Sequence, residues 1–201
     1  MNTDSREYEI LQDAVRGVKN VAGFTCEIGV REGGGTKLIL DTLKQTGQSK
    51  IHIAIDPFGN IDYEHWENRR EKVDYTNRMK QTMLKNLYAY CYEQSMECLF
   101  FPLEDTEFFK RYADGIPIYN QSKTIMNQYA LVFFDGPHST RTILEEFEFF
   151  TTRIPVGGAL VFDDIDQYPH MQTVDPHVRA NGFAMVKQGE CKVSYVRLRV
   201  Q

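Results

Sequence analysis

Three carboxylates follow a short apolar run near the carboxyl end of the chain. The apolar residues 160–162 (LVF) stop at Asp163 and Asp164, and Asp166 follows after one isoleucine. Adjacent carboxylates raise each other's pKa and cost free energy unless positive charge lies among them. A metal ion, a basic side chain or water must compensate them, so this stretch is a candidate site for ion chemistry.

An earlier apolar run ends in the same way. Asp135 follows the run YALVFF, and His138 comes three residues after it. Together with Asp163 and Asp164, Asp135 would offer oxygen-only ligands, which suit Mg²⁺ and are tolerated by Mn²⁺ and Ca²⁺. An imidazole has an unperturbed pKa of about 6.5, which makes His138 a candidate base at neutral pH.

A glycine-rich turn follows the first apolar run of the chain. Gly29 comes at the end of the run FTCEIG, and Gly33, Gly34 and Gly35 come just before a helical pattern. Glycines permit a tight turn and let a ligand approach the backbone, and a helix start offers free N–H donors. The spacing matches neither the dinucleotide fingerprint G-x-G-x-x-G nor a P-loop.

Two acids near this turn indicate what its ligand contains. Glu27 precedes the turn, where it suits a cationic group better than a pyrophosphate. Asp56 ends the second apolar run, and an acid at that place can accept the two hydroxyls of a ribose. The alternative is a plain strand-to-helix turn with a charged cap.

Hydrophobic periodicity predicts the elements that position these side chains. We expect helices over 5–21, 37–45, 78–94, 106–114 and 140–154, strands over 24–30, 51–58, 96–105, 129–139 and 155–166, and a closing hairpin from 183–189 and 192–200. Residues 115–128 are expected to be irregular. His52 would lie within a strand, and His170 and His177 in a late loop.

Strands that alternate with helices predict an α/β fold with a doubly wound, mostly parallel sheet. The closing hairpin would add antiparallel strands, giving a seven-stranded sheet. We expect one domain over residues 1–201, with an N-terminal helix over 1–21 and a helical insertion or lid over 59–97. Ligands collect at the carboxyl ends of parallel strands. All five strands end in acid, at Glu27, at Asp56, at Glu104 and Asp105, at Asp135, and at Asp163 and Asp164.

Composition excludes several classes of protein. The 201-residue chain has a net charge of −5, from 23 basic and 28 acidic residues, which argues against a nucleic-acid binder. No apolar stretch reaches the roughly 18 residues of a membrane span, and the charged start lacks a signal-peptide pattern. We therefore expect a cytoplasmic protein with no membrane partner. The four cysteines form no CxxC pair and are expected to be reduced and mostly buried.

The ordered motifs resemble a known family. Residues 27–34 read E-x-G-x-x-x-G-G, residues 56–58 read DPF, residues 135–139 read DGPHS and residues 157–164 read GGALVFDD. Together they resemble class I S-adenosylmethionine-dependent methyltransferases, in particular the macrocin- and catechol-type O-methyltransferases grouped as methyltransferase family 24. The resemblance covers roughly residues 22–200 and implies a Rossmann-like sheet.

The resemblance also implies roles for the strand-end residues around the cofactor. The amino-acid and sulfonium end of S-adenosyl-L-methionine would border Glu27, Gly29, Gly33 and Gly34, and the ribose would be held by Asp56. The adenine would contact Glu104 or Asp105, although Asp105 could instead cap the next helix.

In the resembling enzymes the metal ligands fall on Asp135, Asp163 and Asp164, with Mg²⁺ or another divalent cation as the second cofactor. Asp135 and His138 would do the catalysis, with His138 as the base. Many relatives carry a second acid where this chain has Pro137, which leaves His138 as the nearest candidate.

Structural roles remain alternatives at these positions. Asp163 and Asp164 could form a helix N-cap pair, His138 could cap the helix that begins at Thr140, and Asp135 could contact the cofactor without a metal. Asp166 is expected to be solvated or to support the ligands.

We therefore expect a methyltransferase that methylates an oxygen of a small hydroxylated molecule, such as a sugar, a glycosyl group or a natural-product alcohol. A metal-independent N- or O-methyltransferase and a non-catalytic cofactor-binding domain are the alternatives. The aromatic and basic residues of 59–97, among them His65 and Trp66, would face the substrate or mediate a homodimer.

Overall fold

Short apolar strands build the centre of the molecule. The computed structural model describes residues 1 and 5–198. Every residue is buried in the strands β1 (Phe24–Ile28), β2 (His52–Ile55), β8 (Tyr129–Phe134) and β9 (Ala159–Phe162). Continuous burial of this kind is typical of parallel strands that helices cover on both faces.

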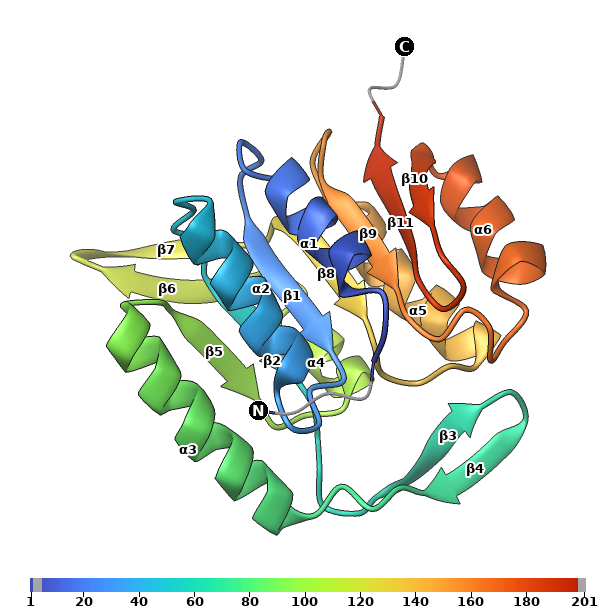
Figure 1. The fold of residues 1–201 in the computed structure, drawn as a ribbon, viewed down its shortest axis with the longest axis horizontal. Coiled ribbons are helices and arrows are strands. Elements are labelled where there is room, and N and C mark those ends of the chain that lie inside the picture. The colour runs from blue at the N-terminus through green and yellow to red at the C-terminus, as the bar shows by residue number, and fades with distance from the viewer. Residues whose placement is uncertain (2–4, 199–201) are drawn as a thin grey trace.

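The strands form a seven-stranded sheet in the order β10-β11-β9-β8-β1-β2-β5 (Figure 1). The five strands β5 (Cys98–Phe101), β2, β1, β8 and β9 run parallel to one another. The closing hairpin of β10 (Phe183–Gln188) and β11 (Val193–Arg197) is antiparallel and joins the sheet through β9. The predicted α/β class, the parallel sheet and the terminal hairpin are confirmed.

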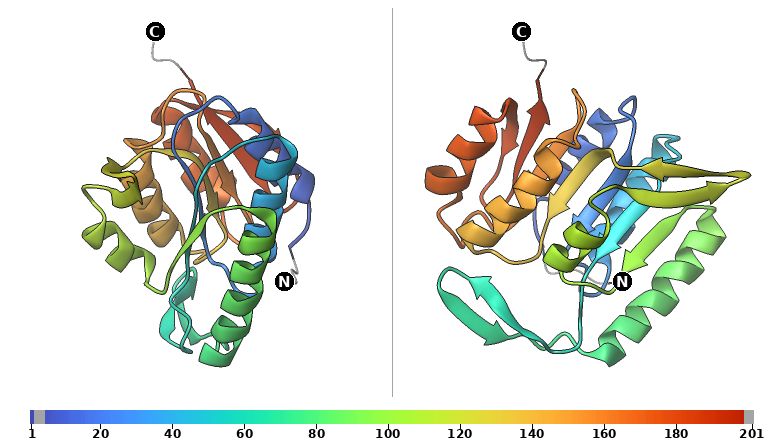
Figure 2. Two further views of the ribbon diagram at one scale, coloured as in Figure 1. Left: turned by 90° about the vertical axis from the view of Figure 1, so that its left-hand side faces the viewer. Right: turned by 180° about the vertical axis from the view of Figure 1, so that it is seen from behind.

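Helices cover both faces of the sheet. On one face lie α1 (Tyr8–Gly17), α2 (Gly34–Gln45) and α3 (Asn77–Gln94). On the other lie α4 (Asp105–Arg111) and α5 (Thr140–Thr151), with α6 (His170–Ala180) beside α5 and β10 (Figure 2, right). Apolar side chains on the helices make these contacts, and the periodicity predicted all of the helices except α6.

Residues 115–128 were expected to be irregular, and this prediction was wrong. They form an antiparallel hairpin of β6 (Ile116–Asn120) and β7 (Ser122–Met126), with Gln121 at the turn in a left-handed conformation (φ 59°). The hairpin pairs with no strand of the main sheet, and most of its residues are at least partly exposed. Pro117 within β6 argues against a strand, and an exposed hairpin needs no one-sided apolar alternation.

The expected late loop around His170 and His177 is also corrected, because it is the helix α6. His170, Val174 and Val178 are buried along one face of it. Pro176 lies inside this helix, and a proline normally argues against a helix interior. Tertiary packing on α5 and β10 overrides that local preference.

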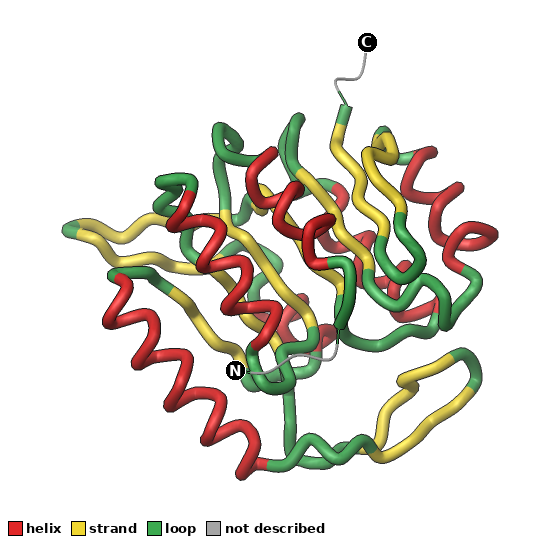
Figure 3. Tube along the Cα trace, in the orientation of Figure 1, coloured by secondary structure: helices red, strands yellow, loops and turns green. Residues whose placement is uncertain are grey.

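The insertion 59–97 is helical only in its second half. The predicted helix over 78–94 is confirmed as α3, whose Thr76 cap accepts a hydrogen bond from the Met79 N–H. Before it, β3 (Asp62–Trp66) and β4 (Arg69–Lys72) form a separate antiparallel hairpin. This hairpin lies apart from the main sheet, beyond the carboxyl ends of its strands (Figure 3).

Among the helices of the described residues, none is long and apolar enough to cross a membrane. All four cysteines are buried and free, and the expected burial is confirmed.

Candidate active site

A pocket of about 610 Å³ opens at the carboxyl ends of the parallel strands. Its walls are the loops that follow β1, β2, β5, β8 and β9, together with the β3–β4 hairpin. The sequence placed the candidate site at this edge of the sheet, where open parallel sheets bind their ligands.

At two positions at the start of the pocket, neighbouring atoms leave no room for a Cβ, so only glycine fits. Gly29 has a φ of 86°, and a Cβ there would lie 2.1 Å from the backbone oxygen of Asp135. A Cβ at Gly35 would lie 2.1 Å from Oε1 of Glu27. The first glycine lets the loop after β8 approach β1, and the second lets α2 begin directly above Glu27.

Glu27 supports the glycine turn from the interior of the protein. Glu27 is buried below the start of α2, where its carboxylate accepts a hydrogen bond from the Thr36 hydroxyl and lies 3.7 Å from Nε2 of His52. Glu27 and Gly33 are not among the residues that line the pocket, whereas Gly29, Gly34 and Gly35 are. Glu27 therefore supports the turn instead of facing the pocket.

Asp56 lines the pocket and also fixes the backbone of the turn. Its Oδ2 accepts hydrogen bonds from the N–H groups of Val30 and Arg31, each at 2.9 Å, and its Oδ1 accepts one from the Phe58 N–H at 3.0 Å. Burial raises the pKa of Asp56, and the three N–H donors oppose that rise. The loops after β1 and β2 are thus joined through one carboxylate.

Glu104 and Asp105 line the pocket at the start of α4. Glu104 is the N-cap residue without a side-chain capping bond, and Asp105 Oδ1 accepts a hydrogen bond from the next N–H, that of Thr106, at 2.6 Å.

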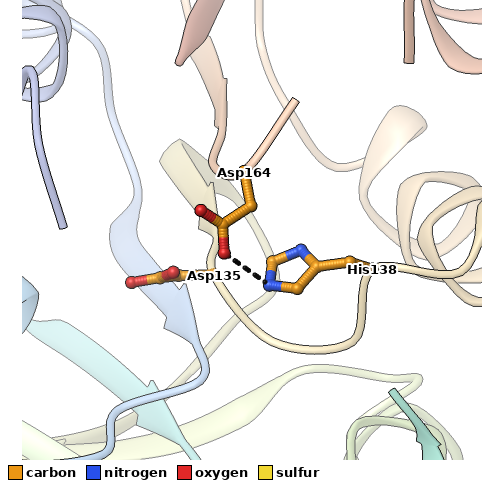
Figure 4. Close-up of side chains that lie close together, drawn as sticks. All are labelled: Asp135, His138 and Asp164. Carbon is orange, nitrogen blue, oxygen red and sulfur yellow. Dashed lines mark ion pairs between the residues drawn. The ribbon is translucent and has the colours of Figure 1, made fainter. Parts of the chain in front are cut away.

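Asp135, His138 and Asp164 come together at the other end of the pocket (Figure 4). One ligand atom from each lies within 4.8 Å of the other two. His138 Nε2 is 3.2 Å from Asp164 Oδ2. Asp164 adopts a left-handed φ of 50°, which an aspartate tolerates better than most residues and which turns its chain direction just after β9.

The surroundings of Asp164 and Asp135 shift the pKa values of these two acids in opposite directions. The hydrogen bond from His138 holds the pKa of Asp164 below its usual range. Desolvation and the nearby carboxylates of Asp163 and Glu27 raise the pKa of Asp135 well above its usual range. One end of the pocket therefore combines an imidazole with one acid whose pKa is lowered and one acid whose pKa is raised.

Asp163 is next to Asp135 but is not one of the three residues whose ligand atoms lie within 4.8 Å of one another. Its Oδ1 is 2.6 Å from Nζ of the fully buried Lys192, and its Oδ2 accepts a hydrogen bond from the Ser5 hydroxyl at 2.6 Å. The structure thus brings His138 together with two of the three acids expected to bind a metal, and it pairs the third with a lysine.

The two helix-capping alternatives do not hold. Ser139 caps α5, since its hydroxyl accepts the Thr142 N–H, so His138 is not the cap. Helix α6 begins at His170 with Pro169 as its N-cap residue, so Asp163 and Asp164 do not cap it.

Three neighbours of the site were missed or left aside by the sequence analysis. The imidazole of His138 stacks against the rings of Trp66 and Tyr168, and His138 is 4% exposed. Lys192 could have been recognised from the sequence, because it is a single charge within the otherwise uncharged run CKVSYV. Tyr168 could not, since nothing in its neighbouring sequence distinguishes it from a core tyrosine.

Known proteins share this fold and its motifs. The model of a methyltransferase domain, methyltransferase family 24, matches residues 26–165. The uncharacterized protein R132 of Acanthamoeba polyphaga mimivirus is 26% identical over 152 residues, which make up 76% of this chain and 56% of that protein. The chain thus corresponds to little more than half the length of this relative.

Solved structures with the same fold include three methyltransferases. The calicheamicin methyltransferase CalS11 has a TM-score of 0.63 at 15% identity, over 94% of this chain and 78% of that one. An O-methyltransferase from Bacillus cereus in complex with SAH has a TM-score of 0.57 at 11% identity, over 93% and 79%. The SAH-bound Podospora anserina methyltransferase PaMTH1 has a TM-score of 0.53 at 9% identity, over 98% and 81%.

At these identities the solved structures show the fold, and the family model adds the match along the chain. The matched residues 26–165 include the glycine turn, Asp56 and the acidic ends of β8 and β9. The chain belongs to methyltransferase family 24, and its domain is of the class I S-adenosylmethionine-dependent type.

Proposed function

We propose that this chain transfers the methyl group of S-adenosylmethionine to a hydroxyl oxygen of a small molecule, and that His138 and Asp164 together take up the proton. The observation that carries the proposal is the His138–Asp164 pair, 3.2 Å apart beside Asp135, in the pocket that begins at the glycine turn of a methyltransferase domain.

The pocket fits a cofactor that is cationic at one end and carries a ribose and a base. Its lining is acidic at several points, and the backbone at Gly29 and Gly34 is open to close approach. We assign cofactor contacts to the pocket-lining residues Gly29, Gly34, Asp56, Glu104 and Asp105, with Glu27 and Gly33 shaping the turn. When bound, S-adenosylmethionine supplies an activated methyl group on a sulfonium that leaves as a neutral thioether.

The chain's own task is to align the acceptor hydroxyl and to remove its proton. A hydroxyl with a pKa far above 7 is a weak nucleophile, and a positioned base contributes about 10²–10⁴ to the rate. The ring nitrogen of His138 that does not face Asp164 would accept the proton, and the carboxylate of Asp164, beside Nε2, would stabilise the imidazolium that forms. Asp135, whose pKa is raised by burial and by the neighbouring carboxylates, would orient the oxygen through a hydrogen bond.

A divalent cation is the second candidate for the same place. An imidazole nitrogen and oxygens of two carboxylates lie within 4.8 Å of one another, and such mixed donors suit Mn²⁺, Fe²⁺ or Zn²⁺. Asp135, His138 and Asp164 would hold the ion, which when bound lowers the pKa of a coordinated hydroxyl. The expected Mg²⁺ set of Asp135, Asp163 and Asp164 would require Asp163 to leave Lys192.

For the acceptor, we propose a sugar or another small hydroxylated molecule. CalS11, which shares the fold, is described as a TDP-rhamnose 3'-O-methyltransferase. The pocket volume of about 610 Å³ falls within the range of about 300–1,000 Å³ that is usual for small-molecule sites. Tyr63 and Trp66 in its wall offer aromatic faces for a planar or sugar ring.

Calorimetric titration with S-adenosylhomocysteine, followed by labelled methyl transfer to a panel of sugars, catechols and amines, tests the proposal. Wild type should bind S-adenosylhomocysteine and methylate at least one hydroxyl compound. His138→Gln and Asp164→Asn should lower turnover about 10²–10⁴-fold and keep S-adenosylhomocysteine affinity within about twofold. The exposed His177, paired with Glu148 on the far side of α5, provides the control His177→Gln, which should change neither.

Each other outcome removes a definite part of the proposal. No binding of S-adenosylhomocysteine would overturn the cofactor, and unchanged turnover in His138→Gln would overturn the base. Methylation of amines alone would replace O-methylation by N-methylation. Mn²⁺ binding that is lost in His138→Gln and Asp164→Asn, but kept in His177→Gln, would favour the metal site.

A further inference from the structure

The β3–β4 hairpin is bonded directly to the loop that carries His138. The His138 N–H donates to the backbone oxygen of His65 at 2.7 Å, and Trp66 forms a parallel β-bridge with His138. The hairpin thus pairs with the loop after β8 as a short additional strand would.

Two further contacts fix the hairpin onto the start of α5. Oε1 of Glu67 accepts the Thr140 N–H at 2.7 Å, and Oε2 of Glu64 lies 2.8 Å from Nη2 of Arg141. An acid at a helix N-terminus is favoured by the free N–H groups and the helix dipole. Four consecutive hairpin residues, 64–67, therefore contact the segment 138–141, although the hairpin leaves the sheet after β2.

The hairpin also supplies one of the two rings that stack against His138. The centroid of the His138 imidazole is 5.1 Å from that of the Trp66 ring, at an interplanar angle of 29°. It is 5.9 Å from that of the Tyr168 ring, on the loop after β9, at an interplanar angle of 20°. Two stacked rings and the bonded backbone N–H restrict rotation of the imidazole out of its plane.

We propose that Trp66 is a positioning residue for His138: with Tyr168 it fixes the plane of the imidazole so that Nε2 points at Asp164 and the other ring nitrogen can take the proton of the acceptor hydroxyl. This inference rests on the proposed function, in which His138 takes the proton. The insertion after β2 is then a wall of the active site that orients the base, in addition to any contact it makes with the acceptor.

Trp66 favours the reaction in a second way. The face of an indole attracts a cation more strongly than that of tyrosine or phenylalanine, at ring separations within about 6 Å. The imidazolium that forms when His138 accepts the proton lies over this face, so the stacking stabilises the product of proton transfer more than the neutral ring. A restrained, well-aimed base gains rate because misplacement of a reacting group by about 1 Å can cost about 10²-fold.

The first readout is the nitrogen NMR signals of the His138 side chain. Long-range ¹H–¹⁵N spectra of wild type, Trp66→Phe and Trp66→Ala would be recorded with S-adenosylhomocysteine, and His138→Gln identifies the signals among the five histidines. Arg69→Ala is the matched control, since Arg69 is exposed on the same hairpin and pairs with Glu71. We expect wild-type nitrogen shifts in Trp66→Phe and Arg69→Ala, and shifts of a reoriented or averaged imidazole in Trp66→Ala.

The second readout is turnover of the acceptor found in the methyl-transfer panel. Trp66→Ala should lower kcat about 10–100-fold with KM changed by less than about threefold, and Trp66→Phe should recover most of the loss. A loss confined to KM would make Trp66 an acceptor contact and overturn the positioning role. Unchanged His138 shifts in Trp66→Ala would overturn it as well.

These readouts separate the two proposals. If wild type fails to bind S-adenosylhomocysteine, the proposed function falls, while the His138 shifts of the free protein still decide whether Trp66 orients the ring. S-adenosylhomocysteine affinity kept in all four variants would show that the fold and the cofactor part of the pocket are intact.

Discussion

Nζ of Lys192 lies 2.6 Å from Oδ1 of Asp163, and both side chains are buried, at 0% and 2% exposure. Lys192 immediately precedes β11 and Asp163 immediately follows β9, so the antiparallel pairing of Val193 with Phe162 brings the two side chains together. The two adjacent acids of the stretch LVFDDID thus have different partners that compensate their charges. A lysine neutralises Asp163, and His138 pairs with Asp164.

Lys192→Met should destabilise the fold, because it leaves Asp163 buried without a counter-charge. Removing one partner of a buried ion pair typically costs about 3–5 kcal/mol, whereas replacing both by apolar groups is often neutral. We expect Lys192→Met to lower the free energy of unfolding by about that amount in urea titrations, and Lys192→Met combined with Asp163→Leu to recover most of it. Equal stability of the single and double variants would contradict this.

Gly35→Ala should disturb the glycine turn through Glu27. The added Cβ would meet Oε1 of Glu27 at 2.1 Å, and Glu27 cannot retreat easily because it lies buried between Thr36 and His52. We expect a loss of about 1–3 kcal/mol in unfolding free energy and weaker S-adenosylhomocysteine binding. Gly17→Ala is the control, since a Cβ at that helical position meets nothing within 4 Å, and it should be neutral or slightly stabilising.

The stability of the fold should fall in mild acid because of His170. Burial lowers the pKa of His170 to about 4, and its ring nitrogens bond the hydroxyls of Tyr168 and Tyr195. In the unfolded chain a histidine titrates near pH 6.5. Below that pH the unfolded chain binds a proton at this histidine, whereas the folded protein binds it only near pH 4. The unfolding free energy therefore decreases between about pH 6.5 and 4, by roughly 2–3 kcal/mol.

Urea titrations of wild type and His170→Gln at pH 8, 6 and 4.5 test this assignment. The variant should be less stable at pH 8, because it loses the two tyrosine contacts, and its stability should depend less on pH over this window. Burial also lowers the pKa of His65 to about 4, so His65→Gln should remove a further part of the slope. An unchanged slope in both variants would contradict the assignment.

Glu146→Gln should stabilise the protein near neutral pH. Burial and the carboxylate of Asp105 raise the pKa of Glu146 well above its usual range. The folded state therefore binds the Glu146 proton more tightly than the unfolded state. This contribution to the unfolding free energy is complete below the unfolded pKa of about 4.3 and is lost as the pH rises. We expect Glu146→Gln to raise the unfolding free energy by about 1–2 kcal/mol at pH 8 and to change it little at pH 4. The exposed Glu145 gives the control Glu145→Gln, and a pH-independent effect of Glu146→Gln would contradict the argument.

The parallel sheet was predictable because buried strands and amphipathic helices carry strong local patterns. Phe24–Ile28 and Tyr129–Phe134 are continuous apolar runs, and α5 has an apolar stripe at helical spacing. The β3–β4 and β6–β7 hairpins were not predictable in the same way, because exposed strands need no apolar alternation. Helix α6 was hidden by Pro176, whose local penalty is outweighed by packing.

The sequence by itself determined the fold class, the glycine turn, and the edge of the sheet at which the acids gather, because these depend on residue type, period and strand order. Only the tertiary structure decided which charged and aromatic groups meet there. Lys192 reaches Asp163 through the pairing of β11 with β9, and Trp66 reaches His138 through a hairpin that crosses from β2 to the loop after β8. Such pairs lie far apart in the chain, and local periodicity carries no information about contacts that only the packing of distant segments creates.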